Sequence, residues 1–212
     1  MENDKTVVLD FFENHIIKYV VKDLEILNTI EAVENGAGGC AIPQASSTFS
    51  ALDLIGYLIH PQDIRPVNMN FSDLLKNEKY FPELSEYKSN DSYFNSIRDY
   101  IRTYLVHRYV MTKYDIMKNN DIDVLFIDNG GRNVFNVAFF TKIAIKAIQK
   151  IYSDITNDQF VINGYSNEKS VKMIKEKLDK LKSYDFEGKK NLELTDLMTS
   201  TITLETTKSL SD

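Results

Sequence analysis

Apolar residues recur every three or four positions over several stretches of the chain, which is the spacing of one face of an α-helix. In the first stretch, for example, Leu9, Phe12, Ile16 and Tyr19 follow this spacing. The pattern predicts helices over residues 6–34, 46–59, 71–75, 93–118, 138–153 and 166–184. The sequence therefore predicts a mainly α protein.

Two kinds of signal separate these helices. The glycine-rich stretch 35–39 is expected to end the first helix, and Pro43 adds a second break before Ser46 and Ser47, which are good N-caps for the next helix. That second helix is expected to end at His60, directly before Pro61.

One segment departs from the helical period. Two runs rich in β-branched and aromatic residues, 123–128 and 133–137, flank Asn129-Gly130-Gly131. Asn-Gly between such runs is a strong signal for a β-hairpin. A two-stranded hairpin is marginal in isolation, so we expect a helical bundle with the hairpin, at about residues 123–137, packed on it.

The same pattern predicts the domain organisation. Residues 1–155 are expected to form one helical domain that includes the hairpin, and residues 156–190 add an amphipathic helix to the same domain. The final stretch, 191–212, holds nine Ser or Thr among 22 residues. We expect it to be a tail that is weakly ordered or needs a partner to become ordered.

Charge restricts the classes of ligand. The net charge of −6 argues against a broad surface for nucleic acid. Residues 97–118, however, hold five cations and two anions, a local charge of +3, so the rest of the chain sums to −9. This patch is compatible with a small phosphate-bearing target. The alternative is a solvated helix face whose arginines pair with nearby acids.

Other features exclude several classes of protein. The polar start of the chain shows no signal peptide, and its apolar runs fall short of the roughly 20 residues of a membrane span. The single Cys40 excludes an internal disulfide and a cysteine-rich zinc site. Three scattered histidines suggest no metal site, and the loop at 36–39 lacks the Lys-Ser/Thr of a phosphate loop. We expect a soluble cytoplasmic protein without metal, cofactor or membrane partner.

The candidate chemistry lies in the predicted helix 93–118. Arg102, His107 and Tyr109 form the pattern R-x4-H-x-Y. A fixed cation, a group that titrates near neutral pH and a phenol can together handle a phosphate. On an ideal helix, positions 102 and 107 project roughly 140° apart, so the two side chains converge only on something lying against the helix from outside. This geometry favours a homodimer, in which a second subunit closes the cleft.

The segment resembles the HEPN superfamily, whose signature is R-x4–6-H on a late helix of an all-helical bundle, with R-x4-H-x-Y in its toxin branch. The resemblance is specific over residues 97–110 and looser over residues 5–155. It implies a metal-independent endoribonuclease that acts at a dimer interface in toxin–antitoxin systems or phage defence. One departure is Thr103, since family members often carry Asn, Asp or His after the arginine; Thr is shorter and does not titrate.

The resemblance also implies roles. His107 would act as the general base or acid, and Arg102 would stabilise charge on the phosphoryl oxygens. Tyr109 would orient His107 or the phosphate, or accept a nucleotide from a partner antitoxin. The substrate-binding residues would be Thr103, which is expected to hydrogen-bond the RNA, and the cations Arg98 and Arg108, which would hold flanking phosphates.

Structural explanations compete with these roles. His107 is also typical of a half-buried structural histidine, Arg102 could pair with Asp99 three positions away, and Tyr109 could belong to the core. Two further functions therefore stay open: a non-catalytic, dimeric HEPN-like module that binds nucleotide, RNA or a protein partner, and a structural or regulatory helical protein that interacts through its tail.

Overall fold

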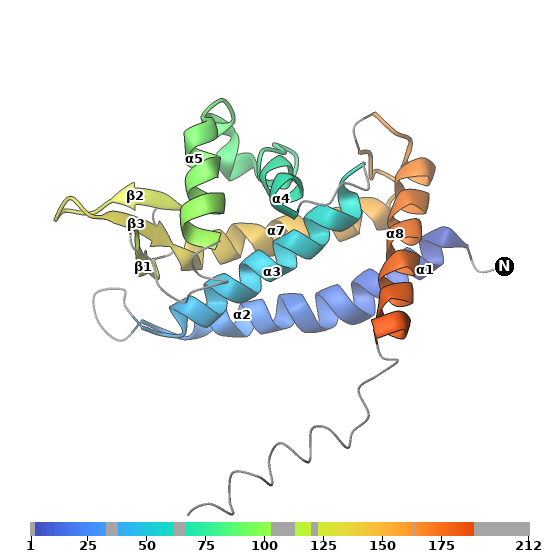
Figure 1. The fold of residues 1–212 in the computed structure, drawn as a ribbon, viewed down its shortest axis with the longest axis horizontal. Helices are drawn as coiled ribbons and strands as arrows, with labels where there is room; N and C mark the ends of the chain where they lie inside the picture. The colour runs from blue at the N-terminus through green and yellow to red at the C-terminus, as the bar shows by residue number, and fades with distance from the viewer. Residues whose placement is uncertain are drawn as a thin grey trace, which may run out of the picture. The chain divides into compact units, whose positions relative to one another are not determined.

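The computed structural model describes residues 3–32, 38–61, 67–102, 113–119, 123–162 and 164–188, without the side chains of 67–70, 100 and 183–188. This part of the chain is mainly helical with a small three-stranded mixed sheet, which confirms the predicted fold class (Figure 1). The chain divides into two compact units, residues 1–175 and 176–212. The sheet and every helix through α7 belong to the first unit.

One continuous helical run opens the chain. It consists of α1 (Asp4–Phe11), the π-helical section η1 (Phe12–Val21) and α2 (Lys22–Thr29). Asn3 caps its start, where the side-chain Oδ1 accepts a hydrogen bond from the backbone N–H of Lys5 at 3.2 Å. The predicted apolar face is buried in part: Phe12, Ile16 and Leu24 are in the core, whereas Tyr19 is 66% exposed. The run ends at Thr29, earlier than residue 34.

The second helix, α3 (Ala41–Ile59), starts five residues before the predicted caps. Cys40 adopts a left-handed conformation (φ 59°) at its N-cap, and Pro43 lies in its first turn. Proline is tolerated there because the first backbone N–H groups of a helix have no partner within it. The prediction that Pro43 breaks the chain and that Ser46 or Ser47 caps the helix was therefore wrong, whereas the predicted end at His60 is confirmed.

An aromatic cluster holds the middle of α3. The ring of Phe49 lies 5.1 Å from Phe140, 5.5 Å from Phe71 and 5.8 Å from Phe135, measured between ring centroids. These partners belong to α7 (Val137–Thr156), α4 (Val67–Leu75) and β3 (Asn133–Asn136). All four rings are fully buried, so the cluster joins three helices and the sheet in one core.

The predicted helix 93–118, which carries the R-x4-H-x-Y motif, corresponds to several shorter elements. A 3₁₀ turn, η2 (Pro82–Tyr87), precedes α5 (Asp91–Asn95) and the π-helical section η3 (Ser96–Arg102). Asn90 caps α5, as its side chain accepts from the backbone N–H of Tyr93 at 3.2 Å. The expectation of helix as far as residue 118 was wrong, because Asp115–Met117 form strand β1.

The sheet has the order β1-β3-β2. Strand β2 (Leu125–Ile127) pairs antiparallel with β3, which confirms the predicted hairpin. Asp128 stabilises its turn by accepting from the backbone N–H groups of Gly130 and Arg132, both at 2.9 Å. Strand β1 pairs parallel with β3 on the other side, and sequence analysis did not predict it.

Helix α7 follows β3 directly. Asn136 caps it by accepting from the backbone N–H of Phe139 at 3.2 Å, and the same oxygen accepts from the N–H of Asn119 at 3.0 Å. The helix packs against α3 and the N-terminal run (Figure 1). The last described helix, α8 (Asn167–Gly188), confirms the predicted helix at 166–184.

Two further predictions concern membrane spans and the C-terminal tail. Among the described helices, none is both long enough and apolar enough to cross a bilayer. The proposed tail, 191–212, lies outside the described residues.

Candidate functional site

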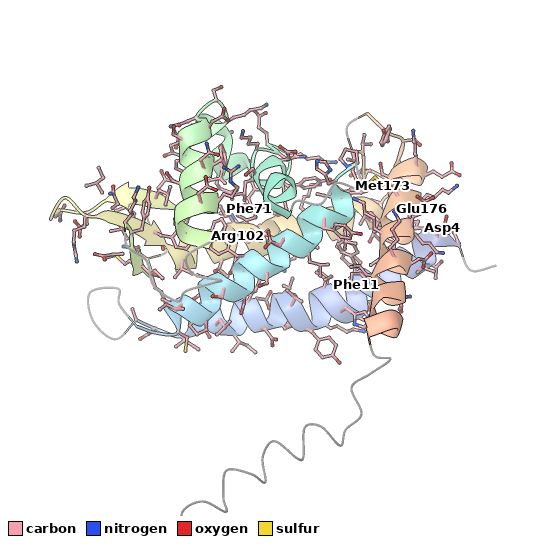
Figure 2. All side chains as sticks on the ribbon, viewed as in Figure 1. Asp4, Phe11, Phe71, Arg102, Met173 and Glu176 are labelled. Atoms are coloured by element: carbon pink, nitrogen blue, oxygen red, sulfur yellow. The ribbon has the colours of Figure 1, made fainter. Side chains whose placement is uncertain are left out.

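Arg102 lies at the end of η3 and is 9% exposed. Its Nε donates to Oδ1 and Oδ2 of Asp53 at 3.1 and 2.9 Å, and its Nη2 donates to Oδ2 at 2.6 Å. Figure 2 shows Arg102 where the α5–η3 segment comes down beside α3, the helix that carries Asp53. The carboxylate therefore holds the plane of the guanidinium in one orientation.

Burial dominates the electrostatics of this pair. Loss of solvent raises the pKa of Asp53 above its ordinary value, while the hydrogen bonds and positive charge of Arg102 oppose that rise. The two side chains are 11% and 17% exposed, so each charge depends on the other for compensation.

Arg98, expected to hold a flanking phosphate, binds its neighbour in sequence. Its Nε and Nη2 donate to the two oxygens of Asp99 at 2.7 and 2.9 Å. Hydrogen bonds from Arg98 lower the pKa of Asp99, partly against the effect of burial. The alternative that Arg102 pairs with Asp99 was wrong, because Asp99 binds Arg98 and Arg102 binds Asp53 of α3.

Lys118 is another cation of the basic stretch, residues 97–118, and it binds backbone oxygens. Its ammonium donates to the carbonyl groups of Leu27 at 2.9 Å, Gly39 at 3.0 Å and Ile30. The charge thereby stabilises the C-terminal end of α2, where carbonyl groups lack helical partners. Burial lowers the pKa of Lys118, and nearby Cys40 works in the opposite direction.

These contacts decide how the described part of the basic stretch is interpreted. Arg98 and Arg102 each hold a carboxylate, and Lys118 holds three carbonyl groups. The two described arginines thus pair with acids, as the alternative expected, but Arg102 is buried and does not lie on a solvated helix face. Thr103, His107, Arg108 and Tyr109 lie outside the described residues, so their predicted roles stay predictions.

Asp53 is the residue that sequence analysis missed. It lies 49 positions before Arg102, beyond any local spacing rule. The sequence did hold one sign of this pairing: Asp53 is the sole charged residue of α3, residues 41–59. A lone carboxylate on a core helix indicates a buried cationic partner, because unpaired charges are rarely buried.

No metal site accompanies this pair in the described ranges, where no group of three or more His, Cys, Asp or Glu side chains is placed to hold an ion. The chain matches no family model, no curated protein and no solved structure. The HEPN resemblance therefore stays a prediction from the residues of the R-x4-H-x-Y motif.

Proposed function

We propose that this chain is a HEPN-like endoribonuclease that cleaves RNA without a metal ion. The observation that supports it most is the geometry of Arg102, the one residue of the R-x4-H-x-Y pattern among the described residues. Its guanidinium is held by Asp53 through three hydrogen bonds of 2.6–3.1 Å. A cation that stabilises a transition state acts best when it is already oriented.

The proposed reaction is an intramolecular transesterification. His107 takes the proton of a ribose 2′-hydroxyl, and the 2′-oxygen attacks the adjacent phosphorus. The bond from phosphorus to the 5′-oxygen breaks, and that oxygen leaves as a hydroxyl after receiving the proton that His107 took, which regenerates the neutral imidazole. Arg102 balances the charge that develops on the phosphoryl oxygens. The products are a 2′,3′-cyclic phosphate and a 5′-hydroxyl end.

In this proposal Asp53 is a positioning residue, since it acts through Arg102. Tyr109 orients His107 or the phosphate, and a second copy of the chain completes the cleft.

The test is incubation of the purified protein with a defined RNA in EDTA. His107→Ala is expected to lower the cleavage rate by about 100-fold or more, the usual contribution of a general base. Arg102→Lys keeps the charge but loses the planar pairing with Asp53, and it is expected to lower the rate by about tenfold. The matched control is Arg132→Lys in the exposed hairpin turn, where Arg132 pairs with Asp128 at 2.6 Å; its rate should not change.

Cleavage that requires a divalent metal, or that survives His107→Ala, would contradict the proposal. So would a strictly monomeric enzyme in sedimentation velocity, because one copy does not complete the cleft. Melting curves of each variant by circular dichroism separate lost activity from lost folding.

A second candidate is a non-catalytic HEPN-like module that binds RNA, nucleotide or a protein partner. The observation that favours it is the compensation of the Arg102 charge by Asp53 at 9% exposure, which weakens the field available to a phosphate. Tight RNA binding in EDTA with intact RNA recovered afterwards would select this candidate.

A further inference from the structure

A small pocket of about 130 Å³ lies at the C-terminal end of α3, where that helix meets α4. Its lining includes Ile59, His60, Asp73, Leu74, Asn77 and Tyr80. All of them belong to the first compact unit and are described residues. The pocket is below the roughly 300 Å³ of sites for drug-sized ligands, so it fits one ring system or one side chain.

The polar groups of this pocket favour a ligand that donates hydrogen bonds. Asp73 is the one carboxylate in the lining, and no Lys or Arg is among the described residues that line it. A phosphate or carboxylate would be repelled. His60 Nε2 lies 3.3 Å from Asp73 Oδ2, which places the imidazole and the carboxylate side by side. The Asp73 side chain is 59% exposed, so a ligand can reach it from solvent.

The remaining walls combine buried apolar side chains with a phenol. Ile59 and Leu74 are buried apolar side chains, and Tyr80 is 3% exposed. Among the described residues, the hydroxyl of Tyr80 completes no well-oriented hydrogen bond. Burial, followed by the nearby charge of Asp154, raises the pKa of this phenol. The accessible lining is somewhat more polar than apolar, so the pocket suits a partly polar molecule that also contacts the apolar side chains.

We propose that this pocket binds a guanine base of single-stranded RNA, an inference that rests on the proposed function and names its sequence preference. A carboxylate accepts two parallel hydrogen bonds from a group with two adjacent donors. On its pairing edge guanine presents such donors at N1 and N2, whereas adenine and cytosine present a donor beside a ring-nitrogen acceptor. Uracil presents one donor between two carbonyl acceptors. Reading a splayed base on this edge is the usual way in which proteins recognise RNA sequence.

The position of the pocket connects it with the candidate site. Asp53 lies on α3 seven residues before His60, the C-cap of that helix, so two helical turns with a rise of about 10 Å separate them along one face. Helix α4, which carries Asp73, also contacts η3, which ends at Arg102. A single-stranded RNA with one phosphate near Arg102 can therefore place a base close to the cleaved bond in the pocket.

The experiment measures binding of the four 5′-nucleoside monophosphates, and of RNA hexamers with or without one guanine, by calorimetry in EDTA. We expect the guanine forms to bind about tenfold or more tightly than the others, as a bidentate base contact discriminates by this order. Asp73→Asn replaces one acceptor by a donor and should abolish the preference. The matched control is Asp10→Asn, an exposed carboxylate of α1 that accepts from Asn14, and it should bind like the wild type.

Equal affinity for all four nucleotides, or a guanine preference that survives Asp73→Asn, would overturn the inference. So would tighter binding of methylguanidinium than of guanosine monophosphate, because the pocket would then suit an arginine side chain of a protein partner. Selective guanine binding without RNA cleavage would support the guanine pocket and contradict the proposed ribonuclease activity. Cleavage at all four nucleotides without guanine binding would support the ribonuclease activity and contradict the guanine pocket.

Discussion

The pairing of Arg102 with Asp53 predicts a large energetic coupling between η3 and α3. Three hydrogen bonds of 2.6–3.1 Å join two side chains that are 11% and 17% exposed. Removing one partner of a buried ion pair costs roughly 3–5 kcal/mol, and the slight exposure of this pair points to the lower end, about 3 kcal/mol. Arg102→Met and Asp53→Leu should each lose about this much stability. The double variant should recover most of it, because two apolar side chains leave no uncompensated charge.

The assay is urea unfolding followed by far-ultraviolet circular dichroism, which suits a helical chain without tryptophan. The pH dependence gives a second readout. Burial raises the pKa of Asp53 even beside Arg102, and Arg102→Met removes the opposing charge. A raised carboxyl pKa favours the folded state at low pH and loses that contribution as the pH rises through the folded value. The destabilisation of Arg102→Met should therefore be smaller at pH 4 than at pH 7. Single-variant losses that add within about 0.5 kcal/mol in the double variant would refute the coupling.

Three further predictions concern the core, each measured by the same unfolding assay. Phe49→Ala should cost about 4 kcal/mol, because it removes the ring that contacts three other buried rings; a loss below about 2 kcal/mol would contradict its central place. Thr48→Val should cost about 1–2 kcal/mol, and more than Thr141→Val, because the Thr48 hydroxyl lies 2.9 Å from that of Thr141 and donates to the carbonyl of Gln44 at 2.8 Å; equal losses would contradict this order. Burial alone would raise the pKa of Asp154, but hydrogen bonds from two lysines lower it below its ordinary 3.8. The ionised Asp154 therefore stabilises the fold above pH 3.8, and this contribution is lost as the pH falls through the lower pKa of the folded state. Asp154→Asn should cost about 3 kcal/mol at pH 7 and flatten the dependence of stability on pH below about 4. An unchanged dependence on pH in that range would contradict the role given to Asp154.

Local signals predicted most of the fold. The hairpin follows from Asn129-Gly130-Gly131 between two strand-forming runs, because a tight turn and its flanking strands are encoded within a dozen residues. The amphipathic helices follow from apolar spacing for the same reason. Strand β1 was missed because three residues at 115–117 carry no periodic pattern, and their pairing with β3 depends on a parallel, non-local register.

The start of α3 shows a different limit. Pro43 is a helix breaker in the interior but is harmless in a first turn, and the left-handed Cys40 sets that turn. Sequence analysis placed Pro43 between two helices because no local signal marked it as part of a first turn.

The candidate site could be predicted only in part. Spacing singled out Arg102, and its burial in a bidentate pair was not predicted, since the partner lies on another helix. The lone Asp53 within uncharged α3 was the available clue. His60 was recognised as a helix end, but its approach to Asp73 depends on how α4 packs on α3, which no local pattern encodes.

The most direct measurement for the central claim compares cleavage of two oligonucleotides in EDTA. One is all RNA, and the other carries a single 2′-deoxynucleotide on the 5′ side of the cleaved bond. The account predicts that the first is cut to a 2′,3′-cyclic phosphate end and that the second is not cut at that bond, because the attacking hydroxyl is missing. Equal cleavage of both substrates, or cleavage that appears only after a divalent metal is added, would contradict it.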